Sequence, residues 1–315
     1  MAVSFADTLA AHVAERESQI VLGLDPDPSA LWPQGAAAQE DRAHAQGPSR
    51  RAAAAVLAHC RAVIDATAPA VVAVKLQLAR FELLGAPGWA ALVAVAEHAR
   101  SLGLLVIADG KRGDIDVSAG AYAAALLDGA DSPFGRLQGL GADLVTVNPL
   151  MGVDALEPFV TAARAGGAGV LVLVRTSNAG AADVEDLAVE GGGTVWERIA
   201  VIVDRLGAPG VGAAGLSDVG AVVGATAPGH LARARELMPC ATFLLPGVGA
   251  QGGRVEDLAA AFAPGRAGGL VTASRSIAGA HLASGEAPES AARAEAERLR
   301  ASAWAISGGA SADVR

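Results

Sequence analysis

Eight short apolar runs, each followed by a loop and most by an Ala-rich stretch, constrain the fold of this chain more than any other feature. Each run is apolar almost throughout, which is typical of parallel strands buried on both faces. The runs are Ile20–Asp25, Val71–Gln77, Leu104–Asp109, Asp143–Pro149, Gly169–Thr176, Val219–Thr226, Thr242–Gly247 and Gly269–Arg275. Helical stretches between them include Arg51–Thr67, Pro87–Ser101, Ser118–Leu127 and Ala227–Met238. This alternation predicts an α/β fold, a (β/α)8 TIM barrel.

The main structural alternative is a doubly wound sheet, which usually carries a Gly-rich dinucleotide turn after its first strand. The segment Gly23–Pro28 has no such pattern. Because we find no linker, we expect residues 1–315 to form a single domain. It would carry a long loop at 28–49 after the first strand and a C-terminal helix at about 289–306. The acidic stretch Ala179–Gly193 is a candidate mobile loop.

Composition limits the partners and the compartment. The net charge of −9 disfavours nucleic acid and anionic membranes as partners. No apolar run approaches the roughly 18 residues that a membrane span requires, and the N-terminus resembles a short amphipathic helix rather than a signal peptide. Cys60 and Cys240 match no metal-ligand spacing and suit a reducing compartment. We therefore expect a cytoplasmic protein without a metal site.

Lysine is rare in this chain. Of 24 basic residues, only Lys75 and Lys111 are lysines and the other 22 are arginines. Arginine keeps its proton at any accessible pH, whereas lysine can donate its proton. The two lysines are therefore candidates for roles that arginine cannot fill.

Charged residues gather where the apolar runs stop, and in a barrel these strand ends converge on one mouth. Asp109 and Lys111 are two residues apart, so an extended backbone would point both side chains the same way. Asp25 and Lys75 close the first and second runs, and Asp114 follows shortly after Lys111. Such an array favours the ammonium form of Lys111, and hence an acid over a Schiff-base nucleophile. A purely structural ion-pair network is the alternative.

A phosphate site is indicated at the last two strand ends. The Gly-rich segment Pro246–Gly253 follows the seventh run, and Ser274–Ser276 follows the eighth. Barrels commonly bind phosphate here through backbone N–H groups and a helix N-terminus. Glycines let the backbone approach the anion, and Arg275 can clamp it with two hydrogen bonds.

The run Asp109-x-Lys111-x-x-Asp114-Ile115 resembles the signature of the orotidine 5′-phosphate decarboxylase family. The resemblance covers essentially the whole predicted barrel. It includes Gly23–Asp25, Lys75, Arg175–Asn178, Pro246–Gly253 and Ser274–Ile277. The long loop after the first strand and Val147–Pro149 resemble the longer bacterial branch of that family, often called type 2.

The resemblance implies a cofactor-independent lyase that converts orotidine 5′-monophosphate to uridine 5′-monophosphate, the last step of de novo pyrimidine nucleotide synthesis. It implies that Lys111 stabilises a carbanion at C6 of the pyrimidine and protonates it. Asp109 would lie against the substrate carboxylate. Asp114 would serve the neighbouring subunit's site, because the family builds each site across a homodimer.

The resemblance also implies a set of substrate-binding residues. Asp25 and Lys75 would bind ribose hydroxyls, and Ser177 would hydrogen-bond the pyrimidine. Gln251 and Arg275 would hold the phosphate. Ser118 stands where many relatives carry Thr, and its hydroxyl implies a ribose contact.

The sequence leaves two other functions open. Sugar-phosphate decarboxylases and aldolases of the same barrel superfamily share the Asp-x-Lys-x-x-Asp run, but they use Mg²⁺ and an extra carboxylate near the second strand. Here that strand offers Lys75, although Glu82 is not far along the chain. The other alternative is a barrel that binds a phosphate ligand without catalysis.

Overall fold

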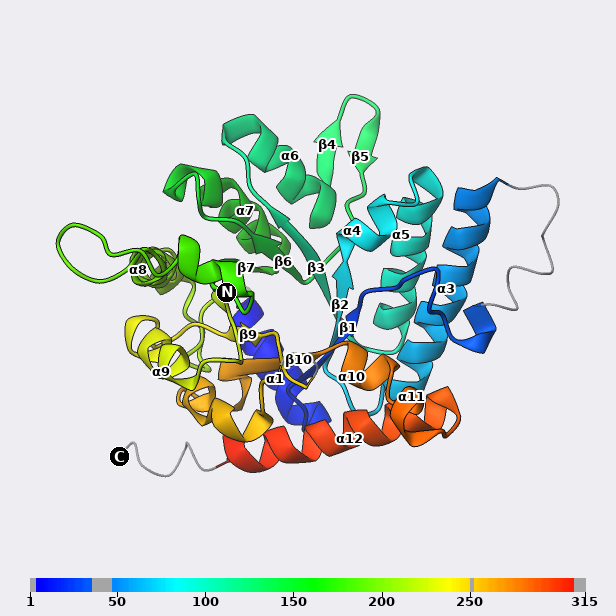
Figure 1. The fold of residues 1–315 in the computed structure, drawn as a ribbon. Coiled ribbons are helices and arrows are strands. Elements are labelled where there is room, and N and C mark those ends of the chain that lie inside the picture. The colour runs from blue at the N-terminus through cyan, green and yellow to red at the C-terminus, as the bar shows by residue number, and fades with distance from the viewer. Residues whose placement is uncertain (1–3, 36–46, 250–251, 309–315) are drawn as a thin grey trace.

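The computed structural model describes residues 4–35, 47–249 and 252–308, and within them eight parallel strands close into a barrel (Figure 1). The order around the barrel is β1-β10-β9-β8-β7-β6-β3-β2. The strands are β1 (Ile20–Leu24), β2 (Ala73–Gln77), β3 (Leu105–Arg112), β6 (Leu144–Val147), β7 (Gly169–Arg175), β8 (Val219–Val223), β9 (Phe243–Leu245) and β10 (Gly269–Ala273). Each overlaps one of the eight predicted runs, with β3 extending three residues beyond its run, so the predicted TIM barrel is confirmed.

Helices surround the barrel. They are α1 (Phe5–Arg16), α3 (Pro48–Thr67), α4 (Leu78–Glu82), α5 (Ala86–Ser101), α6 (Asp116–Leu126), α7 (Val153–Gly166), α8 (Val195–Gly207), α9 (Pro228–Leu237), α10 (Arg275–Ala278), α11 (His281–Ser284) and α12 (Pro288–Ser307). The four helices predicted between strands match α3, α5, α6 and α9 to within about three residues, and α12 is the predicted C-terminal helix. An antiparallel hairpin, β4 (Ala130–Ser132) and β5 (Gly135–Leu137), was not predicted. It projects beyond α6 in Figure 1.

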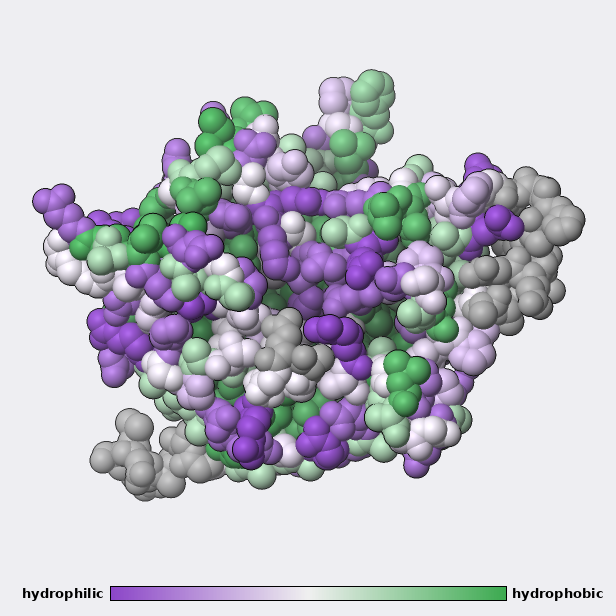
Figure 2. All heavy atoms as spheres, in the orientation of Figure 1, coloured by the Kyte–Doolittle hydropathy of each residue, from purple (hydrophilic) through white to green (hydrophobic). Residues whose placement is uncertain are grey.

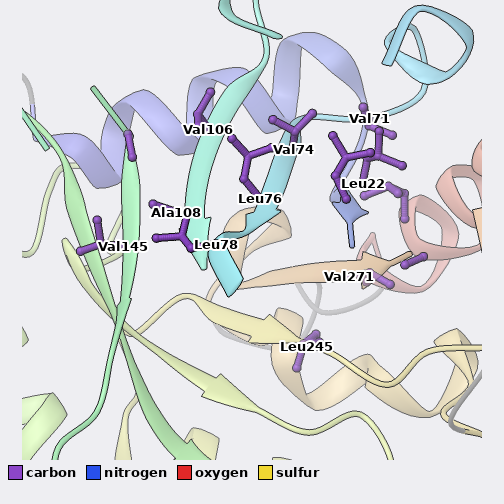
Figure 3. Packing of buried hydrophobic residues seen from close by; sticks show 14 of the residues in the cluster. Leu22, Val71, Val74, Leu76, Leu78, Val106, Ala108, Val145, Leu245 and Val271 are labelled. Carbon is purple, nitrogen blue, oxygen red and sulfur yellow. The ribbon is translucent and has the colours of Figure 1, made fainter. Parts of the chain in front are cut away.

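Apolar side chains form two layers, one on each face of the barrel wall. The outer layer packs the strands against the helices, and Figure 3 shows part of it, with Val74 on β2 and Val106 on β3. The inner layer fills the barrel and includes Leu105 and Leu144 together with Phe5 and Leu9 of α1. Helix α1 therefore covers the N-terminal end of the barrel and leaves the opposite end for a site.

The residues that face the barrel interior continue along each strand to the carboxyl end of the barrel. Successive residues of a strand point to opposite faces, so every second residue faces the interior. On β3 the interior positions run from Leu105 and Ile107 to Asp109, and on β6 from Leu144 to Thr146. The interior is thus apolar at the bottom and polar at the carboxyl ends of these strands.

The long loop after β1 is described only at its two ends, because residues 36–46 of the predicted 28–49 segment lie outside the described ranges. At its start, Trp32 is buried and its indole N–H donates to the carbonyl of Ala278 at 2.8 Å. Its backbone N–H donates to Nδ1 of His59 at 3.0 Å. The loop is therefore fastened to the last residue of α10.

The acidic segment 179–193 after β7 is also held by hydrogen bonds, at its middle. Asp186 forms two hydrogen bonds with Arg175, at 2.8 and 2.9 Å. Glu185 accepts hydrogen bonds from the backbone N–H and the hydroxyl of Thr176, both at 2.8 Å.

Among the described helices, none is both long and apolar enough to cross a bilayer.

Candidate active site

A pocket of about 640 Å³ opens at the carboxyl ends of the strands. Figure 2 views this end, and hydrophilic residues gather around the hollow at its centre. Six of the predicted site residues line the pocket: Asp25, Lys75, Asp109, Lys111, Ser177 and Arg275. The structure thus brings together residues that lie in or directly after β1, β2, β3, β7 and β10 and are far apart in sequence.

The charges predicted to alternate do form a continuous chain of contacts. Lys111 Nζ lies 2.5 Å from Asp109 Oδ1, and Lys75 Nζ lies 2.6 Å from Asp109 Oδ2. Lys75 also lies 3.8 Å from Asp25. Asp109 and Lys75 are buried, whereas Lys111 and Asp25 are partly open to the pocket. Asp109 is therefore a buried carboxylate that contacts both ammonium groups, one at each of its oxygens.

Asp109 keeps its negative charge despite burial. Burial by itself would raise the pKa of this carboxyl, but the charges of Lys75 and Lys111 and their hydrogen bonds outweigh that effect and lower the pKa to about 2. Asp109 is consequently a carboxylate at neutral pH. A fixed negative charge here can orient Lys111 and repel a second carboxylate placed beside it.

The backbone at Lys111 differs from the predicted extended strand end. Lys111 has φ of +46°, in the left-handed region that non-glycine residues rarely adopt. The side chains of Asp109 and Lys111 meet across this turn of the backbone. The prediction that both point the same way is therefore correct, but the extended backbone on which it was based is not what the structure has. The pairing of β3 with β6 shifts register between Ala108 and Arg112, which accommodates the turn.

Three polar residues at the charged side of the mouth were missed by the sequence reasoning. Gln77 donates from Nε2 to Asp109 Oδ2 at 3.3 Å, and Asn148 lines the pocket beside it. Thr146 donates to Asp109 Oδ1 at 2.9 Å. Gln77 follows Lys75 by two positions on one strand, so the period of the pleat was the available signal.

The opposite side of the pocket has an apolar base below a polar rim, which includes Thr176, Ser177 and Asn178 after β7. Leu173, Val222 and Leu244 extend from β7, β8 and β9 into the lining. Beyond them, the segment 246–248 and Arg275 complete the rim. Arg275 is exposed and is the first residue of α10. The Gln251 predicted to accompany it lies outside the described residues.

Two predicted site residues lie outside the pocket lining. Asp114 follows β3 and accepts a hydrogen bond from the N–H of Ile115 at 2.8 Å, and Ser118 is exposed on α6. Within one copy of the chain, the structure therefore does not bring them to the other six residues. Val117, which lies between them in sequence, is an exposed large apolar residue, as are Phe134 and Leu137 of the β4–β5 hairpin and Leu150 after β6.

The carboxylate that a magnesium site would need is engaged elsewhere. Glu82, at the end of α4, pairs with Arg112. It does not line the pocket. Among the described residues, no group of three His, Cys, Asp or Glu side chains is arranged to hold a metal ion.

The sequence and the fold of this chain are similar to those of known proteins. A family model described as orotidine 5′-phosphate decarboxylase / HUMPS family matches residues 18–293. The orotidine 5′-phosphate decarboxylase of Deinococcus radiodurans is 50% identical over 216 residues, covering 68% of this chain and 74% of that protein. The one of Rhodopirellula baltica is 41% identical over 283 residues, covering 89% of each. The solved structure of Leishmania donovani OMP decarboxylase superposes with a TM-score of 0.72 at 30% identity, covering 97% of this chain and all of that one.

Proposed function

The chain belongs to the orotidine 5′-phosphate decarboxylase / HUMPS family, and we propose that its barrel mouth is an orotidine 5′-monophosphate decarboxylase site in which Lys111 is the proton donor. The protein decarboxylates orotidine 5′-monophosphate to uridine 5′-monophosphate in pyrimidine synthesis, as its curated relatives are named to do. The observation that carries the residue roles is the contact chain Asp25–Lys75–Asp109–Lys111 inside the pocket.

The proposed reaction needs no electron sink from a cofactor. The bond from C6 of the pyrimidine to the carboxylate carbon breaks, CO₂ leaves, and the electron pair stays on C6. The ammonium of Lys111 stabilises this carbanion electrostatically and then transfers its proton to C6. Lys111 recovers a proton from solvent before the next turnover. Asp109 holds Lys111 in place and faces the substrate carboxylate, which favours departure of CO₂.

The remaining roles follow the pocket from its charged side to its rim. Asp25 and Lys75 bind ribose hydroxyls, and Ser177 hydrogen-bonds the pyrimidine. Arg275 holds the phosphate, together with Gln251. The apolar wall opposite the charges lowers the local polarity, and electrostatic effects strengthen where water is excluded. Binding of the remote phosphate supplies energy that can be used at the reacting carbon.

Asp114 and Ser118 point to a shared site. We propose that the chain forms a homodimer in which both residues reach the partner's pocket, Asp114 near the reacting group and Ser118 at the ribose. Their position outside the pocket of their own chain supports this. So do exposed apolar side chains on this part of the chain: Val117, between the two residues in sequence, is 81% exposed, and Phe134 at the tip of the β4–β5 hairpin is 97% exposed. Figure 2 shows hydrophobic residues on this projecting hairpin. An exposed apolar group of this kind typically marks an interface.

Three further proposals concern branch, partners and compartment. The long segment after β1 supports membership of the longer bacterial branch. The net charge of −9 supports a protein that does not bind nucleic acid. A cytoplasmic location agrees with its role in nucleotide synthesis and with its two free cysteines.

The direct test is the loss of orotidine 5′-monophosphate in the presence of EDTA. Wild type should turn over fully, and Lys111→Ala should lose at least about 10⁴-fold in kcat because both the acid and the charge are removed. Absence of wild-type turnover would refute the proposal. Turnover that EDTA abolishes and Mg²⁺ restores would favour the magnesium-dependent relatives, for which Glu82 would have to leave Arg112.

Mixing two inactive variants tests the shared site. Lys111→Ala and Asp114→Ala each damage a different residue, so a hybrid dimer contains one pocket with both residues intact. We expect partial recovery of activity on mixing, measured after subunit exchange has been demonstrated with differently tagged chains. Each variant mixed with itself is the control. Exchange without recovery would refute sharing and leave the decarboxylase assignment intact.

A further inference from the structure

The hydroxyl of Thr146 connects the two residues at the centre of the proposed chemistry. Thr146 lies on β6, faces the barrel interior and is fully buried. It accepts a hydrogen bond from the backbone N–H of Lys111 at 2.9 Å and donates one to Asp109 Oδ1 at 2.9 Å. An ionised carboxylate can only accept, so the single hydroxyl proton is committed to Asp109. One side chain thus orients a carboxylate and a backbone amide together.

The bond to Lys111 matters because of the backbone there. Lys111 has φ of +46°, a conformation that persists in a non-glycine residue only where its surroundings hold it. The register of β3 against β6 shifts at this point, between Ala108 and Arg112. The Thr146 hydroxyl accepts the Lys111 N–H inside that interruption of the ladder. Removing it would leave this part-buried donor without its partner and loosen the turn that aims the Lys111 side chain.

The bond to Asp109 matters because the two carboxylate oxygens are held differently. Oδ2 receives Lys75 and Gln77, both from β2. Oδ1 receives the ammonium of Lys111, a long side chain that is 43% exposed, and the hydroxyl of Thr146. Thr146 is therefore the buried, short and stiff contact on the side of Asp109 that faces the proton donor.

We propose that Thr146 is a positioning residue for the decarboxylation, holding Asp109 and Lys111 in their reactive geometry. It is absent from the pocket lining, so it acts through these two residues and does not touch the substrate. The inference rests on the proposed function of the site. It predicts that loss of the hydroxyl slows the chemical step while substrate binding is maintained.

Two substitutions separate the hydroxyl from packing. Thr146→Val keeps the shape of the side chain and removes the hydroxyl, whereas Thr146→Ser keeps the hydroxyl and removes a methyl group. We expect Thr146→Val to lose roughly 10- to 100-fold in kcat for orotidine 5′-monophosphate, from one lost charge-assisted bond. The KM and the Kd for uridine 5′-monophosphate should change little, and Thr146→Ser should stay near wild type. A packing role alone predicts the opposite order, because Ser leaves a cavity and Val does not.

Thr242→Val is the matched control. Thr242 is also a buried threonine, it directly precedes β9 at the end of the barrel away from the mouth, and its hydroxyl donates to the carbonyl of Ala267 at 3.1 Å. This variant should lose stability and keep its kcat. Thr146→Ala serves as a second hydroxyl-free variant if Thr146→Val does not fold, and it should be equally slow. Hydroxyl-free variants with kcat at or above that of Thr146→Ser would overturn the inference. Absence of turnover in wild type itself would instead overturn the proposed function.

Discussion

The two sides of the barrel mouth are built in contrasting ways. On the side formed by β2, β3 and β6, Asp109 accepts four hydrogen bonds from its neighbours, and Lys75 and Lys111 each pair with it. On the side formed by β7, β8 and β9, the lining combines the apolar Leu173, Val222 and Leu244 with a polar rim that includes Ser177 and the exposed Arg275. One side is organised before substrate arrives. The other offers an apolar wall and an unburied cation.

The contrast matches the two tasks that we propose for the site. Stabilising a carbanion requires charges that do not reorganise during the reaction, because preorganised groups act at no cost in the transition state. Holding a phosphate requires an accessible cation that can close on a ligand from solvent. Substitutions on the charged side should therefore lower kcat, and substitutions on the phosphate side should raise KM.

After Lys111→Ala, the largest effect is expected for Asp109→Asn. The variant leaves Lys75 buried without its carboxylate, and removing one partner of a buried pair costs roughly 3–5 kcal/mol in the free energy of unfolding. It also frees Lys111, so kcat should fall roughly 10³-fold. Urea unfolding and steady-state kinetics measure both. A stable variant with kcat close to wild type would show that the charged side is structural, the alternative left open by the sequence.

Arg275→Ala should have the next largest effect, on binding. Loss of a charge-assisted clamp on the phosphate should lower kcat/KM for orotidine 5′-monophosphate roughly 10²-fold, mainly through KM. The comparison substrate is orotidine, which lacks the phosphate, and with it the variant should equal wild type. Equal losses with both substrates would place Arg275 outside the phosphate site.

Trp32→Phe should produce a smaller effect on the same side. The indole of Trp32 holds the carbonyl of Ala278, at the end of the short helix that begins with Arg275. Losing one neutral hydrogen bond should raise KM by up to roughly tenfold while kcat stays nearly constant. Trp304→Phe is the control, since Trp304 stacks on Arg266. An effect of Trp32→Phe on kcat alone would break the proposed division between the two sides.

The smallest effect concerns the pH dependence of stability that arises from His59, which accepts a hydrogen bond from the backbone N–H of Trp32 in the loop after β1. Burial, together with the nearby His281, lowers the pKa of His59 to about 4 from its ordinary 6.5. The unfolded chain therefore takes up a proton as pH falls below 6.5 while the folded chain stays neutral until about 4. Stability falls across this window, by roughly 1–2 kcal/mol at pH 5. Thermal unfolding of His59→Asn, whose amide oxygen can still accept from Trp32, should show a shallower fall. An identical fall in both proteins would exclude His59 as its source.

The eight strands and the charged residues at their ends were predictable because they are local patterns. A strand buried on both faces is an unbroken apolar run. In a parallel barrel the residue after each strand lies at the mouth, and this holds for any order of neighbouring strands. Lys75 and Lys111 stand out against 22 arginines without any knowledge of the fold. The β4–β5 hairpin was missed because its two strands have only three residues each, too few for a pattern.

What only the tertiary structure decided is how those residues are held. Thr146 looks like any strand threonine, and its importance depends on the register of β6 against β3, which places its hydroxyl between Asp109 and Lys111. The left-handed backbone at Lys111 likewise depends on a partner 35 residues away along the chain. The sequence determined the charges and the barrel through nearby residues. Their fixed geometry arises from hydrogen bonds between strands, and these depend on contacts that a one-dimensional pattern does not contain.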